Sequence, residues 1–281
     1  MINFLKNILP PFVVKVYKKY AGYILKAQWE YLPNGFNTKI KSDGWDLQSI
    51  VDLQVSKWEL FKNAVNSLKP LGINHESNNQ QFNLDLYSHN TIYSYAYVLL
   101  LSSHNKSSIK ILDWGGGIGH YGIISDSLLK PIKINIKYNC YDLSKFCIAG
   151  SKLNPNYTYF DNTKSALNNN YDLIIASSSL WYEQDWKETM LNLANSTNEY
   201  LYITRMNFIS KKESYVAVQR PSIFGYNTEY MCWIINENEF IAHAKKIGLE
   251  LIREIYIGHS FPIFKAPEQG HFKGFIFKKN I

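Results

Sequence analysis

Three consecutive glycines follow an aspartate in the segment ILDWGGGIGHYG, residues 111–122. Asp113 precedes Gly115, Gly116 and Gly117, and Gly119 comes shortly after them. A glycine turn placed after an apolar run bares backbone amides, which suit the phosphate or carboxylate groups of nucleotide-type ligands. The segment therefore predicts a nucleoside-binding site and leaves open which nucleoside binds.

Two ligands compete for this turn. The frame from Gly117 to Gly122 matches the GxGxxG pattern of dinucleotide-binding sites. A pyrophosphate binds such a turn through amide N–H groups and the helix dipole, and a carboxylate at Asp113 would repel it. S-Adenosyl-L-methionine carries a sulfonium and an ammonium group, so the same carboxylate favours it. We therefore expect S-adenosyl-L-methionine as the cofactor rather than NAD.

Further polar residues end the next predicted strands. Asp142, in YNCYDLSKF, is placed to accept hydrogen bonds from the two ribose hydroxyls. Asp161 either reaches the adenine amino group or is a solvated turn residue. Ser177 lies where open α/β sheets bind ligands. The predicted cofactor-binding residues are Asp113, Gly115, Gly116, Gly117, Gly119, Asp142, Asp161 and Ser177.

The elements expected to position these residues alternate between strands and helices from residue 106 onward. We expect strands at 109–114, 133–142, 156–160, 171–179 and 200–206, with helices at 120–129, 144–153 and 186–195. Asn236 followed by Glu239 predicts a capping box before another helix. Strands at 249–258 and 271–279, with no helix between them, predict an antiparallel edge. Residues 105–281 are therefore expected to form one α/β domain with a mostly parallel sheet.

The first 104 residues are expected to form an N-terminal helical arm and lid. The patterns predict an arm broken at Pro10-Pro11, a helix at 47–68, a loop at 72–81 and a helix with Asn90 as its N-cap. Residues 1–26 contain five lysines and no acidic residue. Two interpretations stay open: a helical arm that packs on the catalytic domain or a partner subunit, and a basic amphipathic segment in peripheral contact with an anionic membrane.

Composition narrows the class of protein. The chain has 281 residues, 46% of them hydrophobic and 15% aromatic, which argues against disorder. Its net charge of +7 suits an anionic partner. Three cysteines without a CxxC spacing favour a reduced, cytoplasmic protein without structural zinc, so no metal ligands are expected. No RNA-binding motif is present, so no nucleic-acid partner is expected and an RNA-binding methyltransferase is kept as an alternative.

These segments resemble class I S-adenosylmethionine-dependent methyltransferases, and more narrowly a bacterial methyltransferase family associated with surface-polysaccharide biosynthesis. The matching segments are ILDWGGGIG, YDLIIASSSLWY, YITRMNF, SYVAVQRP and WIINENEF, with LPP and GWD near the N-terminus. The resemblance covers almost the whole chain. It implies a doubly wound, seven-stranded, mostly parallel Rossmann-like sheet with an N-terminal helical region, and methyl transfer onto a glycan or its precursor. The chain has Trp181-Tyr182 where the family has Gln-Tyr, and Asp142 where it has Glu.

Methyl transfer to a sugar hydroxyl calls for a general base, because the hydroxyl pKa lies far above 7. Histidine is the usual base near neutral pH, and His89 and His120 are the two candidates. A site without any protein base is an alternative, as is a catalytically silent nucleoside-binding module.

The long connection at 205–233 predicts a substrate-binding insertion around residues 205–235. Guanidinium groups there can bind phosphate or carboxylate, and aromatic faces suit sugar rings. Arg205 is the preferred anchor for an anionic acceptor, with a surface ion pair as its alternative role. The expected partner is a small-molecule or glycan acceptor, and the oligomeric state is left open. The predicted substrate-binding residues are Tyr182, Arg205, Gln219, Arg220 and Tyr226.

Overall fold

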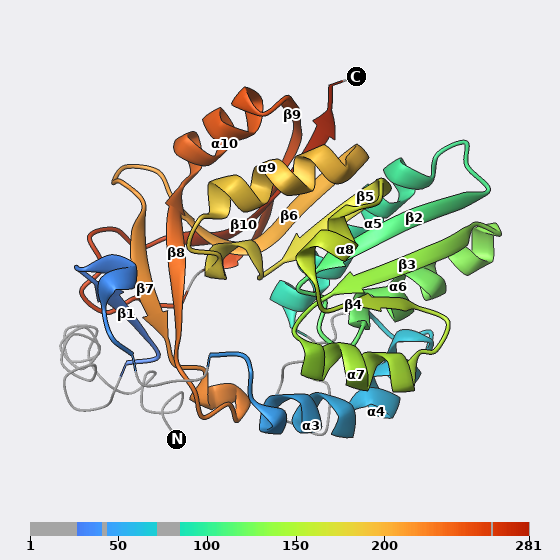
Figure 1. The fold of residues 1–281 in the computed structure, drawn as a ribbon, viewed down its shortest axis with the longest axis horizontal. Coiled ribbons are helices and arrows are strands. Elements are labelled where there is room, and N and C mark those ends of the chain that lie inside the picture. Colours follow the sequence, from blue (N-terminus) through green and yellow to red (C-terminus); the bar gives the residue numbers. More distant parts are fainter. Residues whose placement is uncertain (1–26, 41–43, 72–84, 260, 281) are drawn as a thin grey trace.

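A seven-stranded, mostly parallel sheet forms the centre of the molecule (Figure 1). The computed structural model describes residues 27–40, 44–71, 85–259 and 261–280. All neighbouring strands of this central sheet run parallel except β10, which is antiparallel to β6 and β9. The expected mostly parallel α/β fold and its antiparallel edge pair are therefore confirmed, and the whole sheet has ten strands among the described residues instead of seven. The strand order is β4 (Thr158–Phe160), β3 (Asn135–Tyr141), β2 (Ser108–Trp114), β5 (Tyr171–Ser177), β6 (Thr197–Ile209), β10 (His271–Lys279) and β9 (Leu249–His259).

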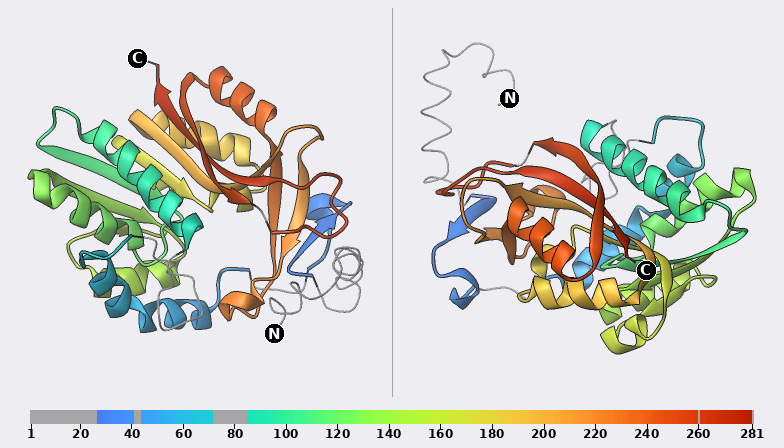
Figure 2. Two further views of the ribbon diagram at one scale, coloured as in Figure 1. Left: turned by 180° about the vertical axis from the view of Figure 1, so that it is seen from behind. Right: turned by 90° about the horizontal axis from the view of Figure 1, so that it is seen from above.

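Helices cover both faces of this sheet, because successive strand side chains point to opposite sides. Ile109 and Ile111 of β2 belong to the apolar cluster that holds α5 (Leu86–Ser103), α6 (His120–Leu129) and α7 (Ser144–Leu153). Leu112 and Trp114 of the same strand belong to the opposite cluster, with α8 (Thr163–Leu167), α9 (Trp186–Ser196) and α10 (Glu237–Lys246). Figure 2 shows α5 crossing the back of the sheet in the view from behind. The sheet is therefore doubly wound.

Three further strands extend the sheet, and the sequence did not predict them. The end of β6 pairs in parallel with β8 (Tyr230–Asn236), which pairs with β7 (Tyr215–Gln219), which pairs with β1 (Trp29–Leu32). The expected long connection at 205–233 is therefore a wrong prediction over much of its length. Its segments YVAVQ and YMCWIIN are rich in β-branched and aromatic residues, which favour strands. The expectation of an entirely helical N-terminal region is likewise wrong at β1.

The helices before β2 differ in detail from the prediction. The expected helix at 47–68 is two helices, α3 (Gln48–Ser56) and α4 (Trp58–Val65), which join at Lys57. Helix α5 begins at Leu86 because the carboxylate of its N-cap, Asp85, accepts the Ser88 amide at 3.0 Å. Asn90 was the wrong N-cap: it lies inside α5, and its Nδ2 donates to the Ile257 carbonyl at 3.0 Å.

Two expectations fall outside the described residues: the arm broken at Pro10-Pro11, with its membrane or partner contact, and the loop at 72–81. None of the helices in the described part of the chain combines the length and hydrophobicity that a bilayer-spanning helix requires. Short 3-10 turns complete the fold, and they lie at Gly35–Asn37, Lys130–Ile132, Leu180–Tyr182 and Ser222–Phe224.

The N-cap of α10 is confirmed, with a modified capping box. The Asn236 side chain accepts the amides of Asn238 and Glu239 at 2.9 and 3.2 Å. The reciprocal half runs through Ser214: its hydroxyl accepts the Asn236 amide at 2.9 Å and donates to the Glu239 carboxylate. Ser214, the residue before β7, thus links the two members of the box.

Arg220 ties the strand extension together instead of facing a ligand. Its guanidinium contacts Glu229 at 2.8 Å, Glu30 at 3.0 Å and the Ala27 carbonyl at 2.8 Å. These partners come from β1, from the residue before β8 and from the chain entering β1. The prediction that Arg220 binds substrate is therefore wrong, because all three directions of its donor fork are taken by the protein.

Replacing Arg220 by methionine should lower the free energy of unfolding by about 2 kcal/mol, between the values for exposed and buried ion pairs. The loss arises because two partly buried carboxylates would face each other without a cation. Urea unfolding measures it, and Lys62→Met is the control. The exposed Lys62–Glu59 pair spans 3.9 Å and should change stability by less than about 0.5 kcal/mol. Equal losses in the two variants would contradict the role of Arg220.

Candidate active site

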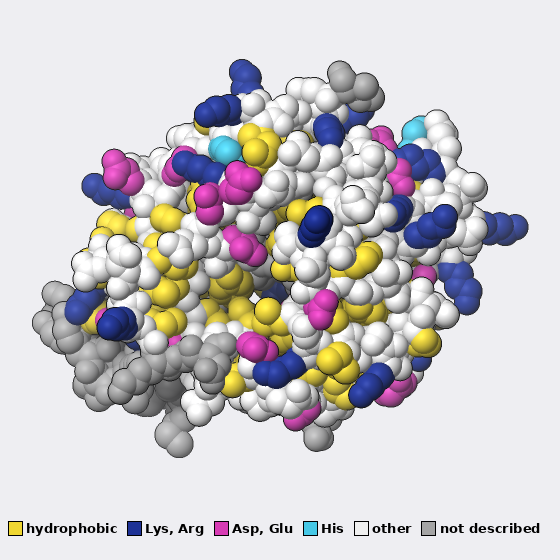
Figure 3. Space-filling model, viewed as in Figure 1, with side chains coloured by type: hydrophobic (Ala, Val, Ile, Leu, Met, Phe, Trp, Pro, Cys, Tyr) yellow, Lys and Arg dark blue, Asp and Glu magenta, His cyan; other side chains and the backbone are white. Residues whose placement is uncertain are grey.

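A cavity of about 610 Å³ opens where the carboxyl ends of β2, β3 and β5 meet the middle of β6 and the strand extension. Figure 3 shows hydrophobic side chains gathered around a hollow near the centre of this face. Its wall includes ten of the predicted site residues: Gly115, Gly116, Gly117, His120, Asp142, Ser177, Tyr182, Arg205, Gln219 and Tyr226. Residues predicted separately for cofactor and acceptor thus share one cavity.

The glycine turn forms one wall of this cavity and directly follows β2. Gly115 has a φ of +73°, and a Cβ atom on it would lie 2.4 Å from Cβ of Ser179. A Cβ atom on Gly116 would lie 2.4 Å from Oδ2 of Asp113 and 2.8 Å from Sγ of Cys140. Larger residues would therefore push the turn off the strand ends. Gly119 is the N-cap of α6 and stands outside the cavity lining.

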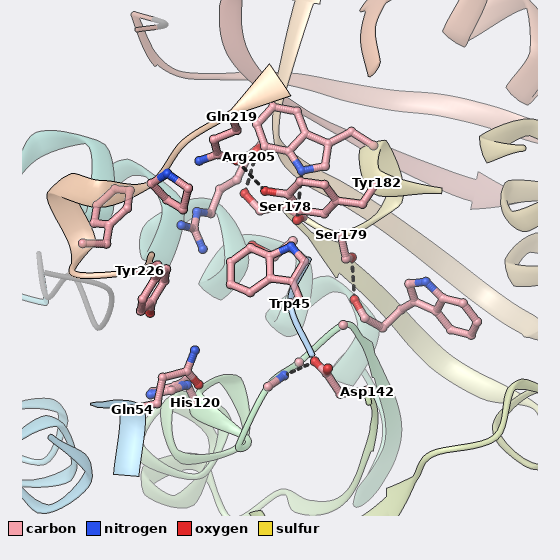
Figure 4. A pocket seen from close by; sticks show the side chains of 18 of the residues that line it. Trp45, Gln54, His120, Asp142, Ser178, Ser179, Tyr182, Arg205, Gln219 and Tyr226 are labelled. Atoms are coloured by element: carbon pink, nitrogen blue, oxygen red, sulfur yellow. Dashed lines mark hydrogen bonds between the residues drawn. The ribbon is translucent and has the colours of Figure 1, made fainter. Parts of the chain in front are cut away.

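Asp142 is the carboxylate that lines the cavity beside this turn. Its Oδ2 accepts the Gly117 amide and its Oδ1 accepts the Leu143 amide, both at 2.7 Å (Figure 4). Each carboxylate oxygen has a second lone pair, so the group retains capacity to accept hydrogen bonds from a ligand. Burial raises the pKa of the Asp142 carboxyl to about 6, while the two amides oppose the rise.

Asp113 has a different position from the one the sequence suggested. Its side chain is 1% exposed, lies beneath Gly116 and accepts the Tyr138 hydroxyl at 2.5 Å. It is not among the described residues that line the cavity, so direct contact with the cofactor is a wrong prediction. Burial raises the pKa of Asp113 to about 7, and the nearby Asp142 adds to the rise. The Asp113 carboxyl therefore lies beneath the turn, and its charge affects the turn electrostatically.

The end of β5 and the middle of β6 form the opposite wall. Ser178 and Arg205 have φ values of +55° and +56°, which side chains rarely adopt. The Ser178 hydroxyl donates to the Arg205 carbonyl at 2.8 Å, so these two residues support each other. Nε of Arg205 donates to the Tyr87 hydroxyl at 3.2 Å. Backbone strain of this kind concentrates at ligand-binding sites.

Aromatic side chains fill the side of the cavity nearest the strand extension. Trp45 stacks on Tyr230 with ring centroids 4.3 Å apart and meets Tyr182 and Tyr226 edge-on at 5.6 and 5.9 Å. The Tyr182 hydroxyl donates to Oε1 of Gln219 at 2.8 Å. Figure 4 shows Trp45 in the middle of the cavity view, with Tyr182, Gln219 and Arg205 grouped above it. The arrangement offers flat apolar faces beside polar groups.

Besides Asp113, Gly119 and Arg220, two more predicted residues lie away from the cavity lining. His89 is in the first turn of α5, where its ring packs on Tyr93 at 4.3 Å, and its assignment as a base stays a prediction. Asp161 is exposed and accepts the Ser144 hydroxyl at 2.6 Å, which makes it a turn residue. His120 lines the cavity, 4% exposed, with its ring edge-on to Trp58 and Phe61 at 5.3 and 4.8 Å.

Sequence reasoning missed several cavity residues. Trp45 and Gln54 come from the segment before β2, and each has a buried polar atom without a hydrogen-bond partner among the described residues. Glu183 follows the turn after β5, and burial raises the pKa of its carboxyl. A polar residue at a core position of an amphipathic helix was the available signal for Gln54. Nothing local marked Glu183, because its burial depends on tertiary packing.

Comparison with known proteins gives distant structural likenesses only. No protein-family model matches the sequence, and no curated protein matches it. The chain is similar to magnesium protoporphyrin IX methyltransferase from Synechocystis PCC 6803, solved with bound SAM, at 13% identity and a TM-score of 0.48, over 85% of this chain and 100% of that one. It is also similar to an S-adenosylmethionine-dependent methyltransferase from Clostridium acetobutylicum, at 12% identity and a TM-score of 0.46, over 68% and 92%.

The buried Asp113 predicts a distinct pH dependence of stability. Its pKa is about 7 in the folded protein and 3.8 as the ordinary value, so its protonated form favours folding. That stability is complete below pH 3.8 and is lost as the pH rises through about 7. The difference is on the order of 4 kcal/mol. Asp113→Asn, which keeps an acceptor for Tyr138, should lose this dependence.

Urea unfolding at pH 5 and pH 8 checks this expectation. The wild-type protein should lose stability between these values, and Asp113→Asn should lose distinctly less. Parallel pH profiles for the two proteins would mean that Asp113 is ionised throughout or does not titrate in this range.

Proposed function

We propose that this chain is an S-adenosylmethionine-dependent O-methyltransferase. The observation that carries the proposal is that two carboxylates flank the glycine turn, with Asp142 accepting the Gly117 amide at 2.7 Å. That amide would otherwise cradle a phosphate. A diphosphate would meet Asp142 in the cavity wall and Asp113 beneath the turn, whereas a cationic nucleoside would be attracted to them. The site thus favours the methyl donor over NAD.

The residues around the turn fit the groups of this donor. Asp142 would accept the ribose hydroxyls, which form charge-assisted hydrogen bonds with a carboxylate. The start of α6 at His120 presents amide groups and a positive dipole end to a carboxylate. Arg205 is the only Lys or Arg among the described residues lining the cavity, and it lies at the β6 side, away from the glycine turn. Within the described part of the chain, the cavity wall at the turn therefore offers no cation to neutralise a diphosphate.

The acceptor half of the proposal is a sugar-like molecule that carries an anionic group. Trp45, Tyr182 and Tyr226 offer flat faces of the kind that pack on sugar rings. Gln219 can hydrogen-bond to hydroxyls, and Arg205 can bind phosphate or carboxylate. A surface glycan, a nucleotide-sugar or a phosphate-bearing sugar substituent meets these requirements. The association with surface-polysaccharide biosynthesis stays a prediction of the sequence resemblance.

The reaction forms a bond between the acceptor oxygen and the methyl carbon and breaks the bond between that carbon and sulfur. The bound donor supplies an activated methyl group, and the hydroxyl proton must leave. His120 and Glu183 are two side chains of the cavity lining that could accept it, and the lining also includes Asp85 and His259. Positioning contributes much of the rate, because well-oriented intramolecular reactions gain up to about 7–11 kcal/mol. The aromatic wall, Gln219 and Arg205 would orient the acceptor for in-line attack.

Isothermal titration with S-adenosylmethionine, S-adenosylhomocysteine and NAD tests the cofactor. Binding of the sulfur ligands without binding of NAD supports the proposal, and the opposite result overturns it. Turnover is tested by S-adenosylhomocysteine formation in the presence of sugar phosphates, nucleotide-sugars and glycans. Donor binding without turnover on any acceptor favours a silent nucleoside-binding module, and a salt-sensitive RNA complex favours an RNA methyltransferase.

Asp142→Ala should weaken S-adenosylhomocysteine binding by about ten- to a hundred-fold, because it removes charged hydrogen bonds to the ribose. Asp161→Ala is the matched control, since this exposed carboxylate ends the neighbouring strand outside the cavity and should leave the dissociation constant unchanged. Titration calorimetry measures both. The same dissociation constant in wild type and Asp142→Ala would remove Asp142 from the ligand site.

Donor affinity should also depend on pH through Asp142. Its pKa of about 6 in the free protein means that the ionised form, which binds the ribose, is depleted as the pH falls below 6. Affinity for S-adenosylhomocysteine should therefore decrease between pH 7 and pH 5, approaching ten-fold per pH unit below pH 6. Asp142→Asn should show a flatter profile. An equally steep decrease in that variant would assign the effect to another group.

A further inference from the structure

Gln54 is a buried amide in the helical segment that precedes the sheet. It lies on α3, on the inner face of the helix with Ile50 and Val51, and is 6% exposed. Helix α3 packs against α7, which follows the strand that ends next to Asp142. Apolar neighbours at Ile50 and Val51 anchor the helix in the same cluster as Phe146 of α7. The position of Gln54 is therefore set by core packing.

The carbonyl oxygen of this side chain has no partner within the described protein. Oε1 of Gln54 is buried and makes no hydrogen bond. A buried polar atom left unpaired costs folding free energy, so such atoms are rare in native proteins. Gln54 lines the cavity, and its Oε1 lies 3.2 Å from the position of a Cβ atom built on Gly117 (Figure 4). The unpaired acceptor thus stands at the glycine turn, where a ligand can reach it.

The neighbours of Gln54 select the group that would pair with it. On one side of Gly117, Asp142 is occupied with the Gly117 amide and is suited to a diol. On the other side, α6 begins at His120 and favours a carboxylate. Gln54 stands next to the turn and beside His120 (Figure 4). An acceptor at this place fits a group that donates N–H hydrogen bonds and is attached next to a carboxylate. The α-ammonium group of an amino acid has this character.

We propose that Gln54 accepts a hydrogen bond from the α-ammonium group of the methionine moiety of the methyl donor. This inference rests on the proposed function and names a positioning residue for it. An amide is suited to this place because Asp113 and Asp142 already bring two carboxylates to the turn. A third carboxylate would raise their mutual repulsion, whereas a neutral oxygen accepts from the ammonium without adding charge.

The consequence is that the N-terminal segment belongs to the cofactor site. Helix α3 would contact the amino-acid end of the donor, while the ends of β2 and β3 would bind its nucleoside end. Loss of Gln54 should therefore affect ligands that carry an amino-acid group and spare ligands that lack one.

The experiment compares two ligands on two variants. S-Adenosylhomocysteine carries the amino-acid group, and 5′-deoxy-5′-methylthioadenosine keeps the adenine, ribose and sulfur without it. Gln54→Met replaces the amide by a side chain of similar length with no acceptor oxygen. Gln48→Met is the control, because Gln48 lies on the same helix, is exposed, donates to Asp52 at 2.8 Å and does not line the described cavity. Titration calorimetry gives the dissociation constants.

Gln54→Met should weaken S-adenosylhomocysteine binding by about ten- to a hundred-fold and change methylthioadenosine binding by less than about two-fold. Gln48→Met should change neither. Equal weakening of both ligands by Gln54→Met would assign Gln54 a structural role and overturn the inference, as would unchanged S-adenosylhomocysteine binding. Wild-type protein that binds neither ligand would overturn the proposed function itself.

A folding control accompanies the titrations. Because Gln54→Met removes an unpaired buried polar atom, the free protein should unfold at the same urea concentration as wild type or a higher one. If Gln54→Met fails to fold, Gln54→Leu provides the same comparison with the two ligands.

Discussion

The hydrogen bond between the Gly117 amide and the Asp142 carboxylate joins the ends of β2 and β3 at the floor of the cavity. Most of the site depends on it. The bond fixes the glycine turn and hence the start of α6, and it holds Asp142 against the cavity. It also makes the turn a poor phosphate cradle, because one amide already serves a carboxylate. A single contact therefore shapes the pocket and biases its choice of ligand charge.

The opposite wall depends on a different part of the chain. Strands β1, β7 and β8 extend the sheet beyond β6, and Arg220 clasps them through Glu30 and Glu229. This extension carries Gln219 and Tyr226 to the cavity and supplies Tyr230 as the stacking platform for Trp45. The glycine-turn side of the cavity is thus built from the parallel sheet, and the aromatic side from an added antiparallel layer. Under the proposed function, changes in this layer would alter acceptor choice without disturbing the glycine turn.

Local patterns allowed much of the fold to be predicted. The alternation of strands and helices after residue 106 and the run Asp113–Gly119 are short-range signals, and the expected helices at 120–129 and 144–153 have those bounds in the structure. Residues that depend on distant partners were not predictable. Arg220 can pair with Glu30 because β1 pairs with β7. Trp45 is held at the cavity by its stacking on Tyr230, which is distant in the sequence. The sequence placed His89 before the helix, whereas α5 begins at Leu86 and includes both His89 and Asn90.

Asp113 illustrates how burial changes an electrostatic inference drawn from sequence. From the sequence, the Asp113 carboxylate was expected to repel a pyrophosphate at the glycine turn. In the structure, its pKa of about 7 leaves it only partly ionised near neutral pH, and Tyr138 and Gly116 enclose it. Asp142 carries more negative charge at that pH and lines the cavity. The carboxylate that would attract a cationic nucleoside is therefore the one after β3, not the one in β2. Because the two carboxylates are coupled, a cation bound beside Asp142 would lower the pKa of Asp113, and ligand binding would release protons.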